Sequence, residues 1–275
     1  MDDILAPTDF SPCADTAAGF AMRLAGKVGG EITFLHLIDV DQHKLKKHKE
    51  EFYSDVSSEV ARSNARLEKY IEDAQETGVR AMKAVHLEQT YKSLVEYIED
   101  NNNFLVVMGS HGATGAKDVL MGSSAQKVVR HSPVPVIVVK EDYQPDNQGG
   151  DNIVLLSDFS EMPALGHRKL LSIARRWQME VHLLYINTPR HFRKSREIYN
   201  GMTDYCKGSK DVVKSMNIVN SWSVEEGIAD YCADHPVGLL AVVSHYHRGI
   251  GHYLHHSTTE DLIRHATVPL LSVHD

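Results

Sequence analysis

Short apolar runs alternate with longer amphipathic segments along the whole chain of 275 residues. Apolar runs of this length are typical of buried strands, and the first half contains five of them: residues 4–6, 31–40, 79–87, 104–108 and 136–139. The segments between them predict helices, which cover residues 12–28, 49–75, 90–101 and a stretch that starts at 123. Alternating strands and helices indicate an α/β fold with a doubly wound parallel sheet, which binds ligands at the carboxyl ends of its strands.

The same pattern starts again after residues 141–150, a polar stretch rich in turn formers that reads as a linker. Ile153–Ser160 repeats Ile4–Ser11, and both copies keep the triplet Asp-Phe-Ser. An internal repeat of this length indicates two similar domains, residues 1–140 and 151–275. In the second domain we expect strands at 153–156, 181–186, 217–222, 239–244 and 270–273, and helices at 163–176, 196–214, 225–234 and 259–265.

Bulk composition excludes several classes of protein. The net charge of −8 argues against nonspecific binding of nucleic acid, because no basic excess is present to neutralise phosphates. No apolar run has the length of a membrane span, and the acidic N-terminus does not resemble a signal peptide. Three widely spaced cysteines indicate neither a disulfide framework nor a paired metal site. A cytoplasmic protein is therefore the expectation.

One segment carries candidate chemistry, with the spacing Gly109-x-x-Gly112-x9-Gly122-Ser123. It follows an apolar strand and leads into a helix. Glycines let a backbone approach an anion, and the N–H groups at a helix start point at it. Ser123 and Ser124 could cap that helix and offer hydroxyl groups to a phosphate. The plain alternative is a loop that only turns the chain.

This glycine spacing, together with Ile4–Ser11, resembles the ATP-binding branch of the universal stress protein family. The resemblance covers both halves of the chain. It implies two five-stranded domains with the adenine nucleotide alpha-hydrolase-like fold, paired through their last strands as an internal pseudo-dimer, and a homodimer is also open. It further implies ATP or another adenine nucleotide with Mg²⁺ or Mn²⁺, a regulatory or stress-protective role and an unknown protein partner, without nucleic acid or membrane.

The resemblance also assigns site residues. Pro7, Asp9 and Leu37 would form the adenine end of the site. The ribose and phosphate end would use Met108, Gly109, His111, Gly112, Gly122, Ser123, Ser124 and Ala125. Two alternatives stay open, since Asp9 could simply be the N-cap of the next helix and His111 could be an exposed loop residue.

The second copy departs from the motif. Ser244, His247 and His256 stand where the first copy has its three glycines, and Leu156 replaces Pro7. We therefore expect no ATP binding of the family kind in this half. Five of the 17 histidines fall in this one loop, and they are candidate Zn²⁺ ligands: His245, His247, His252, His255 and His256. A solvated loop is the plain alternative.

Two rival functions remain open at this stage. The first is a slow adenine-nucleotide hydrolase or transferase, which includes autophosphorylation at Ser123 or Ser124. No catalytic residue is assigned, because no nucleophile, base and orienting group stand together in the sequence. The second rival is a metal-binding or scaffold protein that uses the histidine-rich loop.

Overall fold

The computed structural model of the chain describes residues 3–39, 49–87, 90–101, 103–112, 121–144, 151–160, 165–244, 262 and 266–274. The chain divides into two compact units. Unit 1 ends at Glu141, and unit 2 begins at Asp142. Among the described residues, no helix combines the length and the apolar character needed to cross a bilayer.

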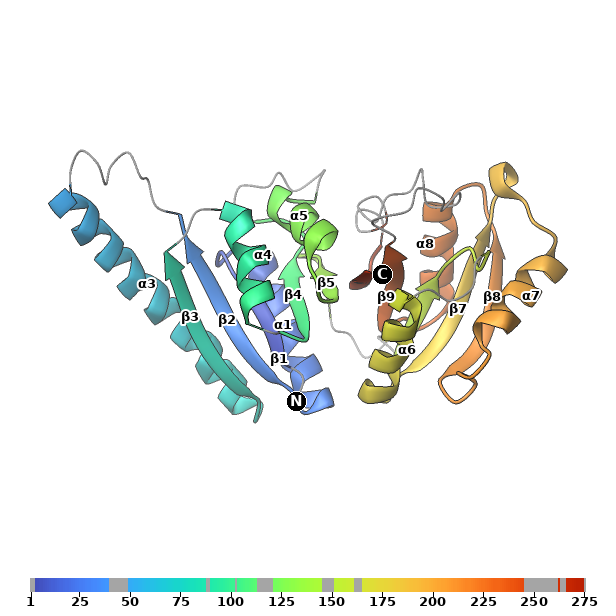
Figure 1. Cartoon of the computed structure of the whole chain (residues 1–275), viewed down its shortest axis with the longest axis horizontal. Helices are drawn as coiled ribbons and strands as arrows, with labels where there is room; N and C mark the ends of the chain where they lie inside the picture. Colours follow the sequence, from blue (N-terminus) through green and yellow to red (C-terminus); the bar gives the residue numbers. More distant parts are fainter. Residues whose placement is uncertain are drawn as a thin grey trace. The chain divides into compact units, whose positions relative to one another are not determined.

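Unit 1 alternates strands and helices in the order β1 (Asp3–Pro7), α1 (Pro12–Val28), β2 (Glu31–Ile38), α3 (Lys49–Glu76), β3 (Arg80–Leu87), α4 (Thr90–Asp100), β4 (Leu105–Gly109), α5 (Ser123–His131) and β5 (Val136–Val139). The strands lie in the order β3-β2-β1-β4-β5, and every neighbouring pair is parallel. Helices α1 and α3 cover one face of this sheet, and α4 and α5 cover the other (Figure 1).

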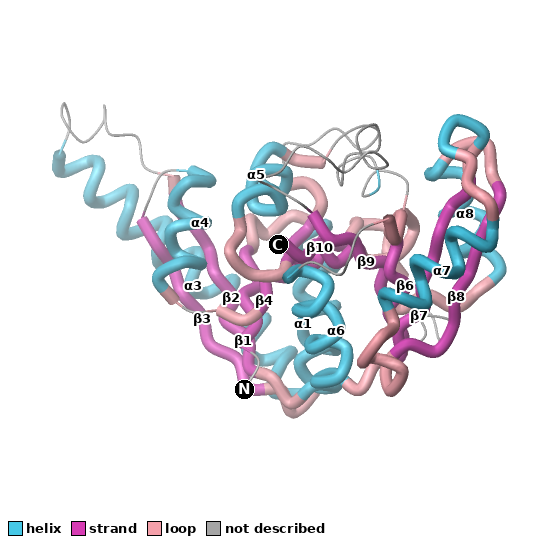
Figure 2. The backbone as a smooth tube through the Cα atoms, turned by 45° about the vertical axis from the view of Figure 1, so that its right-hand side comes forward, coloured by secondary structure: helices cyan, strands magenta, loops and turns pink. Residues whose placement is uncertain are grey.

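Unit 2 runs β6 (Asn152–Leu156), α6 (Leu165–Trp177), β7 (Glu180–Asn187), α7 (Ser195–Tyr205), β8 (Val213–Asn220), α8 (Val224–Asp234), β9 (Leu239–Ser244) and β10 (Leu270–His274). Its strand order is β10-β9-β6-β7-β8, again with parallel pairs (Figure 2). The prediction of two parallel five-stranded α/β sheets is confirmed for the described residues. The internal pseudo-dimer stays a prediction.

Helix α1 shows why these residues fold as they do. Ser11 is its N-cap and accepts a hydrogen bond from the backbone N–H of Ala14 at 3.2 Å. Gly29 ends the helix in a left-handed conformation with φ 70°. One stripe of the helix is buried, and it includes Ala17, Ala18, Ala21, Leu24 and Ala25. Because most of these side chains are small, α1 can approach the sheet closely, and this brings its start to the ends of β1 and β4.

The second half differs from the prediction between residues 196 and 222. The predicted helix over 196–214 is too long, since α7 ends at Tyr205 and β8 already begins at Val213. Gly208 has φ 81° and breaks the helix with a turn, which the periodicity of the sequence did not reveal. The predicted helix over 259–265 lies outside the described residues apart from Leu262.

His182 is a titratable group in the sheet of unit 2. Its imidazole lies half-buried on β7, and Nδ1 is 2.7 Å from Ser215 Oγ. Burial lowers the pKa of His182, and nearby His235 lowers it further, against an opposing effect of Glu180. Below its ordinary pKa of about 6.5 the unfolded chain therefore binds the proton more readily than the folded chain.

We expect the free energy of unfolding of unit 2 to fall as the pH drops below about 6.5. His182→Gln should flatten this dependence, because glutamine does not titrate. Urea titrations from pH 5 to 8, followed by tryptophan fluorescence, measure it, since both tryptophans lie in unit 2. Parallel curves for the two proteins would contradict the assignment.

Candidate functional site

The candidate site lies where the chain leaves β1 and β4 at the carboxyl edge of the unit 1 sheet. These two strands are neighbours, with Ile4 paired to Leu105. From β1 the chain continues to β2 on one side, and from β4 it continues to β5 on the other. Such a change of direction opens a crevice outside the strand ends, which is where doubly wound folds bind ligands.

The turn after β1 presents Asp9. Its Oδ1 accepts a hydrogen bond from the backbone N–H of Ser11 at 3.0 Å, and Thr8 Oγ1 accepts one from the N–H of Phe10 at 2.9 Å. The N-cap of α1 is Ser11, so the alternative that Asp9 is this N-cap is wrong. The Asp9 side chain is exposed just beyond the end of β1.

The glycine loop is the stretch from Gly109 to Gly122, and its two ends approach each other beside Asp9. The backbone N–H of Gly122 donates to Ser110 O at 2.8 Å. A Cβ atom added to Gly112 would collide with Asp9 Oδ2, and one added to Gly122 would lie 3.2 Å from the Cα of His111. The structure thus brings Asp9, Gly112 and Gly122 together, although they are far apart in the sequence.

Helix α5 starts at this junction without a side-chain cap. Gly122 occupies the N-cap position, so the prediction that Ser123 and Ser124 cap the helix is wrong. Both serines are exposed in its first turn, and Ala125 behind them is buried. A helix start of this kind presents backbone N–H groups and the positive end of its dipole, and both favour an anion.

Gly109 has a packing role that the spacing did not reveal. It ends β4 opposite the first turn of α1. A Cβ atom here would lie 2.9 Å from Cys13 Sγ and 3.1 Å from the Cys13 carbonyl carbon. Met108 before it is also buried, at 7% exposure. Glycine is therefore needed at this position to let α1 approach β4, whatever a ligand requires.

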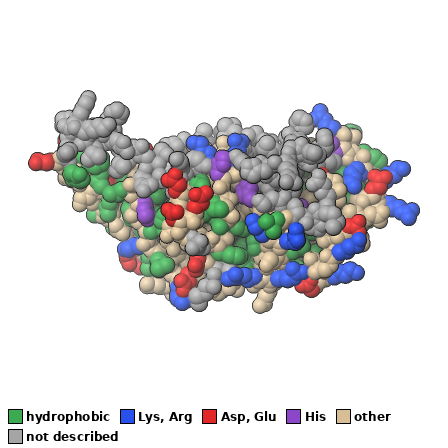
Figure 3. Space-filling view, in the orientation of Figure 1, with side chains coloured by type: hydrophobic (Ala, Val, Ile, Leu, Met, Phe, Trp, Pro, Cys, Tyr) green, Lys and Arg blue, Asp and Glu red, His purple; other side chains and the backbone are tan. Residues whose placement is uncertain are grey.

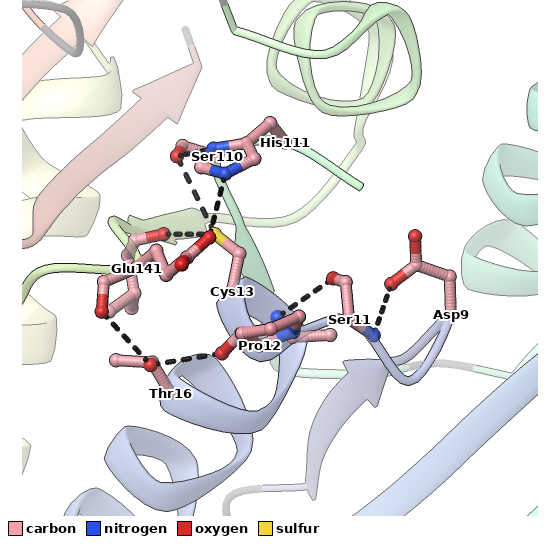
Figure 4. A network of polar contacts seen from close by, with 10 residues as sticks. Asp9, Ser11, Pro12, Cys13, Thr16, Ser110, His111 and Glu141 are labelled. Atoms are coloured by element: carbon pink, nitrogen blue, oxygen red, sulfur yellow. Dashed lines mark hydrogen bonds and ion pairs between the residues drawn. The ribbon is translucent and has the colours of Figure 1, made fainter. Parts of the chain in front are cut away.

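His111 lies in a network of polar contacts instead of solvent. Its Nδ1 is 3.1 Å from Ser110 Oγ, and its Nε2 is 3.2 Å from Glu141 Oε2. The backbone carbonyl of Glu141 accepts a hydrogen bond from Thr16 Oγ1 at 3.3 Å. Figure 4 shows this network beside Cys13, with Asp9 at the N–H of Ser11 on the other side of the start of α1. The alternative of an exposed loop residue is wrong, because the His111 side chain is only 18% exposed.

The predicted adenine end follows the rim between β1 and β2. Pro7 is the last residue of β1 and pairs with Leu35, and the N–H of Thr8 donates to Leu35 O at 2.8 Å. Leu37 stands two residues further along β2 and is half-buried. Pro7, Leu37 and Asp9 therefore border the same edge of the sheet.

Sequence reasoning missed three residues that shape this site: Cys13, Arg66 and Glu141. Cys13 packs on Gly109, Glu141 holds His111, and the Arg66 guanidinium lies over the Phe10 ring. The contact partners are separated by 96, 30 and 56 positions respectively. No local pattern in the sequence marks such contacts, because they arise only when the sheet and helices assemble.

Unit 2 keeps the first turn of this site. Asp158 Oδ1 accepts from the N–H of Ser160 at 3.0 Å, and Ser157 Oγ accepts from the N–H of Phe159 at 3.3 Å. Leu156, which replaces Pro7, is buried. Lys and Arg side chains are exposed around α7 and β8 (Figure 3).

The other half of the unit 2 site falls outside the described residues, including all five candidate Zn²⁺ ligands from His245 to His256. In the part of the chain that the structure describes, no three His, Cys, Asp or Glu side chains lie where they could share a metal ion. The zinc site therefore stays a prediction.

Comparisons with known proteins agree with this architecture. A model of the universal stress protein family matches residues 1–140 and 150–274. Universal stress protein MJ0577 of Methanocaldococcus jannaschii is 28% identical over 151 residues, which cover 50% of this chain and 93% of that protein. Universal stress protein Slr1230 of Synechocystis sp. is 21% identical over 292 residues, which cover 99% of each chain.

The fold is shared with a solved structure over almost the whole chain. The crystal structure of a universal stress protein from Archaeoglobus fulgidus has a TM-score of 0.72 and 20% identity, and the match covers 98% of this chain and 97% of that chain. At this identity the likeness concerns the fold alone. The two matches of the family model, together with the full-length relative, settle the classification. The chain belongs to the universal stress protein family and carries two copies of its domain in tandem.

Proposed function

We propose that unit 1 binds ATP or another adenine nucleotide and that the protein acts as a nucleotide-dependent regulator in a stress response. One observation carries the proposal: Gly112 and Gly122 meet beside Asp9 at the reversal point of a parallel sheet. Asp9 supplies an acceptor, the absence of side chains at the glycines lets a ligand approach the backbone, and the start of α5 supplies backbone donors. Pro7 and Leu37 add an apolar edge for the base.

A divalent cation, Mg²⁺ or Mn²⁺, would be held mainly by the phosphate oxygens and by water. Asp9 brings an exposed carboxylate to the junction of Gly112 and Gly122. The cation would neutralise the phosphates in a protein whose net charge is already −8. In this proposal the protein works in the cytoplasm and passes the state of the site to a protein partner.

The geometry supports the binding of a nucleotide more than its hydrolysis. Ser110 and His111 are within hydrogen-bond distance, and Glu141 orients the ring, as in a hydrolytic triad. The Ser110 side chain is only 5% exposed, however, and its Oγ lies 3.7 Å from Cys13 Sγ inside the unit. It is not presented to a phosphate in the crevice, so we propose no catalytic role for it.

Nucleotide content tests the proposal directly. We expect the purified protein, incubated with ATP and Mg²⁺, to release about one adenine nucleotide per chain on denaturation, a stoichiometry that follows from one intact glycine motif. Gly122→Val should release none, because its Cβ would lie 3.2 Å from the His111 backbone. Chromatography of the supernatant measures both.

His256→Val is the matched control, since His256 stands at the corresponding position of the second copy. It should leave the nucleotide content unchanged. Two nucleotides per chain would show that unit 2 also binds, and none in the unmodified protein would reject the proposed function.

A further inference from the structure

The turn that presents Asp9 contains a strained residue. Phe10 has φ 62°, in the left-handed region that side chains other than glycine rarely adopt. Phe10 follows Asp9 directly, so its backbone conformation helps to decide where the Asp9 carboxylate points. Such a conformation persists only where the surrounding structure holds it.

Helix α3 supplies the first contacts that hold this residue. Arg66 Cζ lies 4.0 Å from the centroid of the Phe10 ring, and Arg66 Nη2 donates a hydrogen bond to Phe10 O at 3.2 Å. On the sheet side, the His36 ring lies 4.5 Å from the Phe10 ring. One arginine therefore fixes both the side chain and the carbonyl of the strained residue.

Tyr70, one turn further along α3, fixes the other side of the turn. Its hydroxyl donates to Asp15 Oδ1 and lies 3.3 Å from Thr8 Oγ1, which accepts from the N–H of Phe10. Burial and the hydrogen bond to Asp15 raise the pKa of Tyr70, so the hydroxyl stays protonated as a donor near neutral pH. The N–H and the carbonyl of Phe10 are thus both bound, and α3 takes part on each side.

Unit 2 also combines a left-handed residue with an arginine in the corresponding turn, although this arginine binds the carbonyl of the preceding residue. Phe159, in the repeated triplet, has φ 49°. Arg193 Nη1 donates to Asp158 O at 2.8 Å, from the segment between β7 and α7. In each unit, an arginine from the chain that follows the second strand donates to a carbonyl of the turn. A left-handed residue and an arginine donor therefore occur together in both copies of this turn.

We propose that Arg66 is a positioning residue for the nucleotide site: it holds Phe10 in the left-handed conformation and so keeps the Asp9 carboxylate against Gly112. This inference rests on the proposed function, because it assigns Arg66 to the nucleotide site of unit 1. Arg66 acts through the turn and does not itself touch the ligand.

Arg66→Met tests the proposal, because methionine keeps an unbranched apolar side chain but removes the cation and its donors. We expect the affinity for ATP with Mg²⁺, measured by isothermal titration calorimetry, to fall about tenfold, the factor that corresponds to releasing one left-handed residue. Arg62→Met is the matched control. Arg62 lies one turn earlier on α3 and pairs with Glu59 at the surface, so its replacement should change the affinity less than about twofold.

The same substitution made in the Phe10→Gly protein distinguishes positioning by Arg66 from direct contact between Arg66 and the nucleotide. Phe10→Gly permits φ 62° without a side-chain penalty and removes the ring on which Arg66 lies. In this background Arg66 keeps only its hydrogen bond to the backbone carbonyl of residue 10, so Arg66→Met should change the affinity by about threefold or less. A tenfold loss that persists there would mean that Arg66 does not act by holding the Phe10 turn, and it would overturn the proposal. An Arg66→Met protein with unchanged affinity would also overturn it.

Amide hydrogen exchange of the nucleotide-free protein gives a readout that does not depend on ligand binding. The N–H groups of Phe10 and Ser11 should exchange about tenfold faster in Arg66→Met than in Arg62→Met. Equal rates would overturn the holding role of Arg66. If instead the unmodified protein binds no nucleotide while the exchange difference is present, the proposed function fails and the holding of the turn stands.

Discussion

Gly109→Val is expected to lower the free energy of unfolding of unit 1 by about 3 kcal/mol. The Cβ atom would lie 2.9 Å from Cys13 Sγ and 3.1 Å from the Cys13 carbonyl carbon, and the backbone of α1 cannot move without disturbing its buried stripe. Valine favours strands, so a loss of stability would report the collision and not the local propensity. Urea denaturation followed by circular dichroism measures the effect without nucleotide.

Two further variants test whether the collision with Cys13 causes this loss of stability. Cys13→Ala in the Gly109→Val protein should recover part of the loss, because it removes the sulfur but leaves the carbonyl group at 3.1 to 3.2 Å. Gly19→Ala should instead raise the free energy of unfolding by up to about 1 kcal/mol, since Gly19 lies inside α1 and its Cβ would meet only the end of Arg23. An undiminished stability in Gly109→Val would contradict the packing role.

Gly112→Val is expected to weaken the binding of ATP with Mg²⁺ about 100-fold, which corresponds to about 2.7 kcal/mol. The added side chain would occupy the space of Asp9 Oδ2 and push the carboxylate out of the crevice. Because the Asp9 side chain is exposed and can turn away, the free energy of unfolding should change by less than about 1 kcal/mol. Calorimetric titration and urea denaturation of the same protein separate the two effects.

Asp9→Ala is the partner variant. If valine acts by displacing Asp9, the double variant should bind only slightly less tightly than the weaker of the two single variants. Losses that add in full would mean that Gly112 and Asp9 serve the nucleotide independently. A stability loss as large as that of Gly109→Val would contradict the distinction drawn between the two glycines.

The sequence predicted the fold because each element has a local cause. Apolar runs mark the strands, Pro12 and Gly29 bound the first helix, and the repeated Asp-Phe-Ser marks the second copy. The prediction of one helix over residues 196–214 was wrong for an equally local reason. Gly208 adopts a left-handed conformation, but a single glycine within an amphipathic stretch does not by itself end a helix.

The site was predicted less completely, because spacing cannot separate two uses of glycine. Gly109 and Gly112 belong to one motif, but one faces Cys13 and the other faces Asp9. The sequence did not predict the environment of His111 either, because His111 contacts Glu141, which lies beyond the last strand of unit 1. Contacts of this kind follow from the assembled sheet, where residues far apart in the chain become neighbours.

The bond between His111 and Glu141 bears on any attempt to express the first half alone. Unit 1 ends at Glu141, one residue beyond the family match that stops at 140. A recombinant fragment truncated after Lys140 would lose both the carboxylate that orients His111 and the carbonyl that accepts from Thr16. A fragment of this half should therefore retain Glu141, because without that one residue His111 in the glycine loop loses its carboxylate partner.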